Sequence, residues 1–280
     1  MIVAAARGAR GEKKKMAAAG KRRRVADARR EETVAMLAER GVMSPSELAA
    51  HFNVSVMTIH RDLNELQRRG IIHKSHGGVT PQPAGTFEAT IAYREAHMVE
   101  AKASIAAAAA RFVTPGSSVM LDDSTTASQL VPHLVEAAAR GPLTVATNFL
   151  GNLRPLAQAD GLSLVALGGD YDPISDSFTG MVCLRDIAAV RVDAVFVSAS
   201  GIADGIAWHP DPQVVAVKQA MLGATKCKYL LVDHSKLGHS ALHEVAPLSD
   251  FDTVVVDADT PAEAVRELEG HGAHVVVAGR

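Results

Sequence analysis

Short polar residues follow a buried apolar run near the middle of the sequence. The segment 121–130, LDDSTTASQL, places carboxylates and hydroxyls directly before a stretch of helical composition. Hydroxyls, free backbone amides and the positive end of a helix dipole together bind phosphate groups. We therefore expect Asp122, Ser124, Thr125 and Thr126 to hold a phosphorylated ligand. The same residue types also cap helices for stability alone, and the sequence leaves both roles open.

Polar residues or glycines follow three further apolar runs. Ligands of parallel sheets bind at the carboxyl ends of the strands, so these residues are expected to gather at one edge. The glycines would let the backbone approach a ligand closely. The further candidates are Thr147, Asn148, Gly168, Gly169, Asp233 and Lys236.

Lys218 lies inside the predicted helix PQVVAVKQAMLG. At helical spacing it shares a face with Val214, Val217 and Met221, where burial is expected. A buried ammonium needs an anionic partner, which makes Lys218 a ligand candidate. Its long apolar stem could instead carry the charge out to solvent, and the pattern alone does not decide between the two.

Other chemistries have little support in the sequence. The tetrapeptide SASG at 198–201 is not a GxSxG nucleophile elbow. His239 and His243 lie four residues apart in a predicted loop, but without the glutamate of an HExxH motif we interpret them as solvated. Cys183 and Cys227 lack metal-ligand spacing and are expected to be small apolar fillers. We expect no catalytic residue, no metal and no cofactor.

Seven apolar runs after residue 88 alternate with Ala-rich helical stretches. Near-continuous apolar strands are buried on both faces, which indicates a mostly parallel sheet covered by helices. The second domain, 88–280, is therefore predicted to be an α/β domain. The runs are 117–122, 143–148, 162–169, 192–200, 227–233, 252–257 and 273–279.

Three helices are predicted in the first domain, 27–79. The first spans residues 27–40, with Val34, Leu37 and Ala38 facing inward. Because the second helix is short and a tight turn joins it to a longer third, the order is typical of a helix-turn-helix.

Capping signals place the second and third helices. Ser44 is a suitable N-cap, Pro45 fits the first helical position and Glu47 completes a capping box. Ser55 caps the third helix, and Gly70 ends it. The following segment IIHKSHGGVT then predicts a β-hairpin wing with a turn at its two glycines.

The third helix has an apolar stripe and an unexplained polar side. Val56, Ile59, Leu63 and Leu66 are expected to face the core. The third helix of a winged helix enters the major groove, so the outward residues are predicted to contact base edges and phosphates. A helix whose polar side is merely solvated remains the alternative. The candidates for DNA contact are Ser44, Ser55, Met57, Thr58, His60, Arg61, Asn64, Lys74 and His76.

Charge is distributed unevenly along a chain whose net charge is −2. Residues 1–24 carry nine Lys or Arg and one Glu, whereas residues 81–280 carry 13 basic and 23 acidic residues. This asymmetry indicates that the amino-terminal end meets a polyanion. Residues 1–26 are expected to be a disordered basic arm, and residues 80–87 a Pro- and Gly-rich linker. No membrane span or secretion signal is indicated.

The segment 44–79 resembles the DNA-binding segment of the DeoR family of bacterial transcription regulators. The pattern S-x-x-T-I-x-R-D-L-x-x-L begins at Ser55, and H-G-G closes the match at His76. The family usually has a second arginine where this chain has His60, so the base preference at this contact is open.

Residues 88–257 resemble the DeoR sensor domain, which is itself similar to ribose-phosphate isomerases. The resemblance implies that the candidate loops surround a phosphorylated sugar. The family usually reads L-D-S-G-T-T where this chain reads LDDSTT, which puts Ser124 at the glycine position. The segment around Trp208 and His209 also departs from the family pattern and is expected to shape specificity.

The resemblance raises the question of catalysis. An aldose–ketose isomerase needs a carboxylate base beside the open-chain sugar. The isomerases carry acidic residues where this chain reads SASGI, and a glutamate at the position of Val217. We therefore expect a sensor that binds without turnover. The alternative is a phosphosugar isomerase with a DNA-binding appendage.

The function implied by the resemblance is repression of sugar or carbohydrate metabolism genes. We expect a homodimer or homotetramer on double-stranded operator DNA in the bacterial cytoplasm, associated with the nucleoid. A phosphorylated sugar would release it by binding the DNA-free conformation better than the bound one.

Overall fold

The computed structural model describes residues 26, 28–30, 32–34, 36–37, 40–68, 72–75, 78–81 and 91–279. The chain divides into two compact units with the boundary after Gln82. The predicted arm, apart from Ala26, and most of the predicted linker lie outside the described residues. Within the described part of the chain, no helix is long and apolar enough to cross a membrane.

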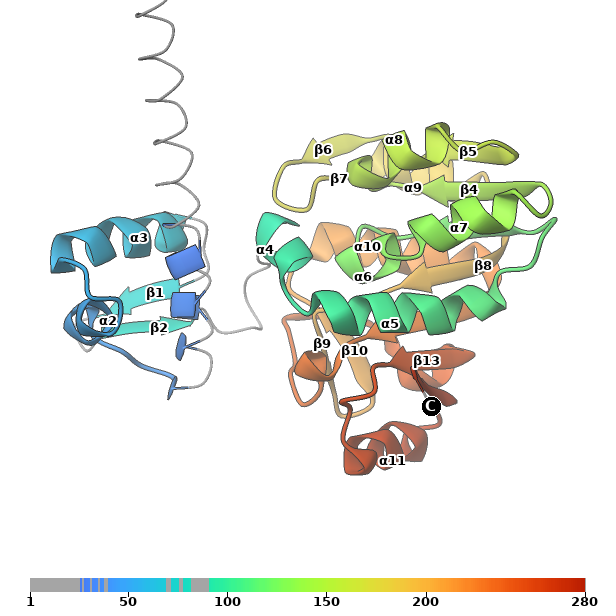
Figure 1. Ribbon diagram of the computed structural model, residues 1–280. Coiled ribbons are helices and arrows are strands. Elements are labelled where there is room, and N and C mark those ends of the chain that lie inside the picture. Colours follow the sequence, from blue (N-terminus) through green and yellow to red (C-terminus); the bar gives the residue numbers. More distant parts are fainter. Residues whose placement is uncertain are drawn as a thin grey trace, which may run out of the picture. The chain divides into compact units, whose positions relative to one another are not determined.

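The first unit contains the three predicted helices. The described residues between 26 and 40 are helical, and α2 (Pro45–His51) and α3 (Val56–Arg68) follow (Figure 1). Ser44 Oγ accepts from the amide of Glu47 at 3.1 Å, and the Glu47 carboxylate accepts from the amide of Ser44 at 2.6 Å. The predicted capping box is confirmed, and it starts α2 at Pro45.

The core of this unit is built mainly from leucine and isoleucine. Ile59, Leu63 and Leu66 of α3 are all buried, as predicted. The expected burial of Val56 is wrong, because its side chain is 41% exposed. Val56 is the first residue of α3, and a helical side chain points back toward the amino terminus, so this one extends beyond the packed turns.

The predicted wing is an antiparallel hairpin. Strand β1 (Ile72–Ser75) pairs with β2 (Gly78–Pro81), and Met43 adds a bridge to Val79. At Gly78, φ is +135°, and a Cβ there would lie 2.8 Å from the carbonyl oxygen of Met43, so only glycine fits. The hairpin extends to Pro81 and therefore takes two residues from the segment expected to be linker. Proline is tolerated at the end of this edge strand.

The second unit is built on a seven-stranded, wholly parallel sheet, as Figure 1 shows in part. All seven predicted runs are strands of this sheet, so the predicted fold is confirmed. In spatial order the strands are β14 (Val275–Val277), β13 (Thr253–Val256), β11 (Thr225–Val232), β8 (Val192–Val197), β3 (Ser118–Leu121), β4 (Leu143–Thr147) and β5 (Leu162–Ala166).

Helices cover both faces of the sheet. Alternate strand residues enter different cores: Val195 and Val197 belong to one, and Phe196 to the other. One core takes side chains from α5 (Val99–Ala109), α6 (Thr125–Ser128), α7 (Val131–Ala138) and α8 (Leu150–Ala157). The other takes them from α9 (Gly180–Ala188), α10 (Pro212–Gly223) and α11 (Ala262–Gly270).

Several smaller elements surround the carboxyl ends of the strands and were not predicted. They are α4 (Ile91–Ala96), the hairpin of β6 (Asp170–Asp172) and β7 (Ser177–Thr179), and the sheet of β9 (Gly201–Ala203), β10 (Ile206–His209) and β12 (His243–Pro247). Short 3-10 helices span Ala110–Phe112, His234–Lys236 and Leu248–Asp250. The loop expected at His243 is therefore wrong, because its backbone pairs with His209. Cys227 is exposed and is not the buried filler expected.

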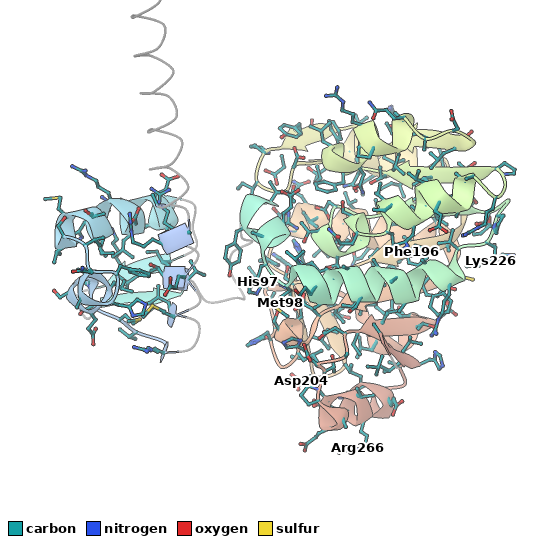
Figure 2. All side chains as sticks on the ribbon, in the orientation of Figure 1. His97, Met98, Phe196, Asp204, Lys226 and Arg266 are labelled. Carbon is teal, nitrogen blue, oxygen red and sulfur yellow. The ribbon has the colours of Figure 1, made fainter. Side chains whose placement is uncertain are left out.

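The strand order reverses between β3 and β8. The chain builds β3, β4 and β5 outward on one side, then returns to add β8, β11, β13 and β14 on the other. A crevice for ligands forms outside the carboxyl ends of strands at such a reversal. Figure 2 places His97 and Met98 at one end of the unit and Lys226, near the start of β11, at the opposite end.

Candidate functional site

Lys218 is buried and paired with two carboxylates. Only 2% of its side chain is exposed, so the solvated alternative is excluded. Its Nζ donates a short hydrogen bond to Asp122 Oδ2 and lies 3.1 Å from Asp123 Oδ1. Both carboxylates follow β3, whereas Lys218 comes from α10 on one face of the sheet. The anionic partner that burial requires is thus supplied by the chain itself.

Asp122 connects the two halves of the sheet. Its Oδ1 accepts from the amide and hydroxyl of Ser124, which caps α6. Its Oδ2 accepts from the amide of Ser198, which follows β8, at 2.8 Å. The Asp122 carboxylate therefore links the candidate phosphate-binding loop, residues 122–126, to β8 on the other side of the reversal point. Ser198 was not among the predicted site residues.

Asp123 is charged although it is fully buried. Burial would raise the pKa of its carboxyl, but the electrostatic effects of Lys218, Arg94 and His209 together hold that pKa below its ordinary value. Its Oδ2 also accepts from Ser177 Oγ at 3.2 Å, which ties β3 to the β6–β7 hairpin. His209, from the segment expected to shape specificity, thus acts electrostatically on this pair.

A second buried lysine, Lys102, was missed by the sequence reasoning. It lies on α5, is 5% exposed, and donates to Thr125 Oγ1 at 2.9 Å and to the carbonyl oxygen of Arg94. Burial, followed by the charge of Lys236, lowers its pKa to about 8. The signal that identified Lys218, a lone lysine among apolar helix residues, also occurs in the segment VEAKASIAAAA and would have found it.

Thr147 and Asn148 lie at the carboxyl end of β4 and are buried. Thr147 Oγ1 accepts from the amide of Phe149 at 3.2 Å, so it shapes the turn into α8. Asn148 Nδ2 donates to the carbonyl of Phe178 at 2.9 Å, while its Oδ1 has no hydrogen-bond partner among the described residues. Asn148 and Asp123 both contact β7, which brings the two strand ends together.

The paired glycines have different surroundings. A Cβ on Gly169 would lie 2.3 Å from the carbonyl oxygen of Thr179, and φ is +149° there. Gly169 is therefore required because the backbone of Thr179 lies too close to leave room for a side chain. At Gly168 a Cβ would meet nothing within 4 Å, so this position leaves room beside the strand end.

Asp233 and Lys236 flank the site from β11. Asp233 Oδ1 accepts from the amide of Ser235 at 3.1 Å, whereas its buried Oδ2 has no hydrogen-bond partner in the described part of the chain. Both charges act on Lys102, and both also act on His97, whose pKa is lowered by burial and then by Lys236. Lys102, which donates to Thr125, is therefore within electrostatic range of both Lys236 and Asp233.

A possible metal cluster lies beside this group. His234, Asp257 and Asp259 offer ligand atoms within 4.8 Å of one another. However, His234 Nδ1 lies 2.7 Å from Asp257 Oδ2, and its amide donates to Asp257 Oδ1 at 2.7 Å. Both oxygens of the Asp257 carboxylate are therefore already in contact with His234.

The predicted DNA contacts of α3 form one exposed stripe. Met57, His60, Arg61 and Asn64 lie at positions i, i+3, i+4 and i+7 and are all exposed. Thr58 is half-buried. The buried carboxylate of Asp62 on the same helix accepts from Arg29 and Arg30, which fastens the first helix to α3.

Other predicted contacts serve local structure as well. The Ser44 and Ser55 hydroxyls accept from the amides of Glu47 and Thr58, so both cap helices. Lys74 of the wing donates to Asn64 Oδ1, which joins the wing to α3. Burial lowers the pKa of Lys74. His76 lies outside the described residues.

Comparison with known families agrees with this two-part structure. The DeoR-like helix-turn-helix domain matches residues 29–82, and the DeoR C-terminal sensor domain matches residues 97–258. In the solved structures, ribose 5-phosphate isomerase A from Methanocaldococcus jannaschii is similar with a TM-score of 0.37 and 16% identity, covering 49% of this chain and 53% of that one.

Curated relatives match along nearly their whole length. The HTH-type transcriptional regulator YgbI of Escherichia coli is 31% identical over 89% of this chain and 97% of its own. The repressor AccR of Agrobacterium fabrum is 30% identical over 83% and 90%. The glycerol-3-phosphate regulon repressor of E. coli is 30% identical over 85% and 93%. The predicted resemblance is confirmed: the chain belongs to the DeoR family of transcriptional regulators.

Proposed function

We propose that the protein represses carbohydrate metabolism genes and that a phosphorylated sugar, bound at the strand ends of the second unit, releases it from operator DNA. The proposed effector residues are those named from the sequence, together with Lys102 and Ser198. A relative that is named for a glycerol-3-phosphate regulon supports an effector of this chemical class.

The surroundings of Lys102 give the main support for a phosphorylated effector. Its hydrogen-bond partners in the described chain, the Thr125 hydroxyl and the Arg94 carbonyl, are neutral. A buried ammonium with neutral acceptors is stabilised strongly by an anion. Asp233 offsets part of this charge and Lys236 adds to it. A phosphate beside Thr125 would meet the Lys102 ammonium and the Thr125 hydroxyl, with the charge of Lys236 acting on the same lysine.

Asp122, Asp123 and Lys218 have a different proposed role. Their charges already compensate one another, so they provide a fixed polar wall for the hydroxyls of the sugar rather than a phosphate cradle. The buried Asn148 Oδ1 and Asp233 Oδ2 are acceptors that further ligand hydroxyls can satisfy.

On the DNA side, the proposed contacts are the exposed stripe of α3 and the wing. Arg61 is suited to guanine, because a guanidinium pairs bidentately with its major-groove edge. His60 and Asn64 would contact base edges or phosphates, Met57 a thymine methyl, and Lys74 a phosphate. Binding as a homodimer or homotetramer would match repeated half-sites.

We propose binding without turnover. Although Asp122 and Asp123 place two carboxylates at the site, both accept hydrogen bonds from Lys218, and Asp122 accepts three more. A general base must instead be available to the substrate proton. Conversion of ribose 5-phosphate into a ketose phosphate by the purified protein, together with loss of this activity in Lys218→Ala, would overturn this assignment.

Calorimetric titration with a panel of pentose and hexose phosphates tests the effector site. We expect one compound to bind, Thr125→Val and Lys102→Met to weaken it, and the unphosphorylated sugar to bind at least about tenfold more weakly because it lacks a charge-assisted contact. Ser104→Ala is the matched control, since this hydroxyl donates only to Ala101 within α5. Equal binding of the sugar and its phosphate would contradict the proposed phosphate site.

A further inference from the structure

Helix α4 is the first described element of the second unit. Residues 82–90 connect it along the chain to the wing strand β2, and α5 follows it directly. Within the second unit, α4 is therefore the described element that lies nearest along the chain to the DNA-binding unit. What holds α4 in place is consequently of interest for regulation.

Hydrogen bonds to the ligand-site loops hold α4 at both ends. The amide of Ile91 donates to the carbonyl of Ile174, in the β6–β7 turn, at 3.1 Å. Near its other end, the carbonyl oxygen of Arg94 accepts from Lys102 Nζ and from Thr125 Oγ1, the latter at 3.3 Å. The donors that fasten α4 are therefore the same donors that the proposed phosphate would use.

Phosphate binding and the fastened position of α4 compete for one hydrogen atom. A threonine hydroxyl has a single O–H donor, so Thr125 cannot donate to Arg94 and to a phosphate at the same time. Lys102 has three donors, but a phosphate oxygen at its Nζ would lie close to the Arg94 carbonyl oxygen. That carbonyl belongs to the carboxyl end of α4, where the helix dipole repels an anion.

Met98, between α4 and α5, is a candidate hinge in the backbone. Met98, labelled with His97 in Figure 2, has φ of +54° and ψ of +38°, which places a non-glycine residue in the left-handed region. Its side chain makes no cap hydrogen bond to α5. Such a conformation persists only when the surrounding contacts enforce it. The Met98 carbonyl accepts from the amide of Lys102 at 2.9 Å, and the side chain of the same lysine donates to the Arg94 carbonyl.

We propose that the Arg94 carbonyl, Lys102 and Thr125 form a ligand-operated latch: an anionic group that takes the Thr125 and Lys102 donors displaces the Arg94 carbonyl and frees α4 to turn about Met98. This inference rests on the proposed phosphate site and adds the route by which the site reaches the segment leading to the DNA-binding unit. Without ligand, the Arg94 carbonyl acts as the acceptor that an anion would otherwise supply.

Hydrogen exchange of the full-length protein tests the latch, with inorganic phosphate as the probe and chloride at equal ionic strength as the reference. Thermal melting first reports whether phosphate binds. We expect phosphate to raise the melting temperature and to speed exchange of the amides of residues 91–96 about two- to tenfold, as for loss of one net hydrogen bond. Amides of α10 should exchange no faster.

Variants separate the latch from the site. Thr125→Val keeps the side-chain shape and removes the donor, so exchange at 91–96 should already be fast without phosphate and respond less to it. Lys102→Met should behave alike, whereas Ser104→Ala should match the wild type.

Two results would overturn the inference in distinguishable ways. Stabilisation by phosphate with unchanged or slower exchange at 91–96 would remove the latch and leave the phosphate site. Absence of any stabilisation would remove the phosphate site and the latch with it.

Discussion

The amide of Ser198 donates a 2.8 Å hydrogen bond to Asp122 across the reversal point between β3 and β8. Lys218, from α10, donates to the same carboxylate oxygen. Two strands and a helix therefore meet at one buried side chain. These buried polar groups satisfy one another's charges and hydrogen bonds. A substitution at one of them therefore also lowers the stability of the second unit.

Lys218→Met should destabilise the protein by about 3–5 kcal/mol, because it leaves the buried carboxylates of Asp122 and Asp123 without their cation. Urea unfolding at pH 7 measures the loss. Adding Asp123→Asn should recover part of it, since one uncompensated charge is removed. If the double variant is no more stable than Lys218→Met, the uncompensated charge on Asp123 is not a cause of the loss.

Phosphate affinity should fall as pH rises above about 8. Without ligand, Lys102 loses its proton near this pH rather than at its ordinary value of 10.5, because burial opposes its charge. Binding then requires reprotonation, which weakens affinity by up to about tenfold per pH unit above the pKa. Titration calorimetry from pH 7 to 10 measures this, and Lys102→Met should bind weakly with a flat profile. A wild-type profile that is equally flat would exclude Lys102 as the titrating contact.

The same pKa has a consequence for stability. A folded-state pKa of about 8 means that between pH 8 and 10.5 the unfolded chain binds more protons at Lys102 than the folded one. The contribution of this group to stability therefore rises with pH across that window. Urea unfolding should show a smaller increase, or a steeper decrease, in Lys102→Met than in the wild type. Parallel curves would contradict the lowered pKa.

Arg61→Ala should cost about 1–3 kcal/mol of specific DNA binding and relax the sequence preference, because a bidentate base contact is lost. Deleting residues 1–24 should weaken all DNA alike and reduce the salt dependence. Arg140→Ala is the control, since Arg140 is an exposed arginine of the second unit paired with Glu136. An Arg61→Ala protein with unchanged selectivity would place base recognition elsewhere.

Asp62→Asn should destabilise the first unit by about 1–3 kcal/mol, because charge-assisted bonds from Arg29 and Arg30 are lost at a carboxylate only 4% exposed. Hydrogen exchange of α3 measures this locally. Glu136→Gln, which breaks an exposed pair, should cost less than about 0.5 kcal/mol. Equal effects of the two changes would mean that the Asp62 contacts are not stabilising.

Local signals predicted most of the fold. The capping box at Ser44 placed α2, and the apolar runs placed all seven sheet strands, because both depend on neighbouring residues. The β6–β7 hairpin was missed, since its short strands are partly exposed and lack an apolar pattern. Val56 was misassigned because helical spacing does not tell where packing along a helix begins.

The site was predictable by residue type but not by partner. Hydroxyls and carboxylates after strands could be named from spacing, whereas the contact of Lys218 with Asp122 joins residues 96 positions apart. Such pairing depends on strand order, which the sequence does not reveal. Arg94 was not predictable as a latch component, because its contribution is a backbone carbonyl, and every residue has one.

Fluorescence anisotropy of labelled DNA from the region upstream of the protein's own coding sequence, titrated with phosphosugars at fixed salt, tests the central claim most directly. We predict sequence-selective, salt-sensitive binding that one phosphosugar reverses in the wild type and does not reverse in Thr125→Val. Selective binding that every phosphosugar leaves unchanged would contradict the proposed effector.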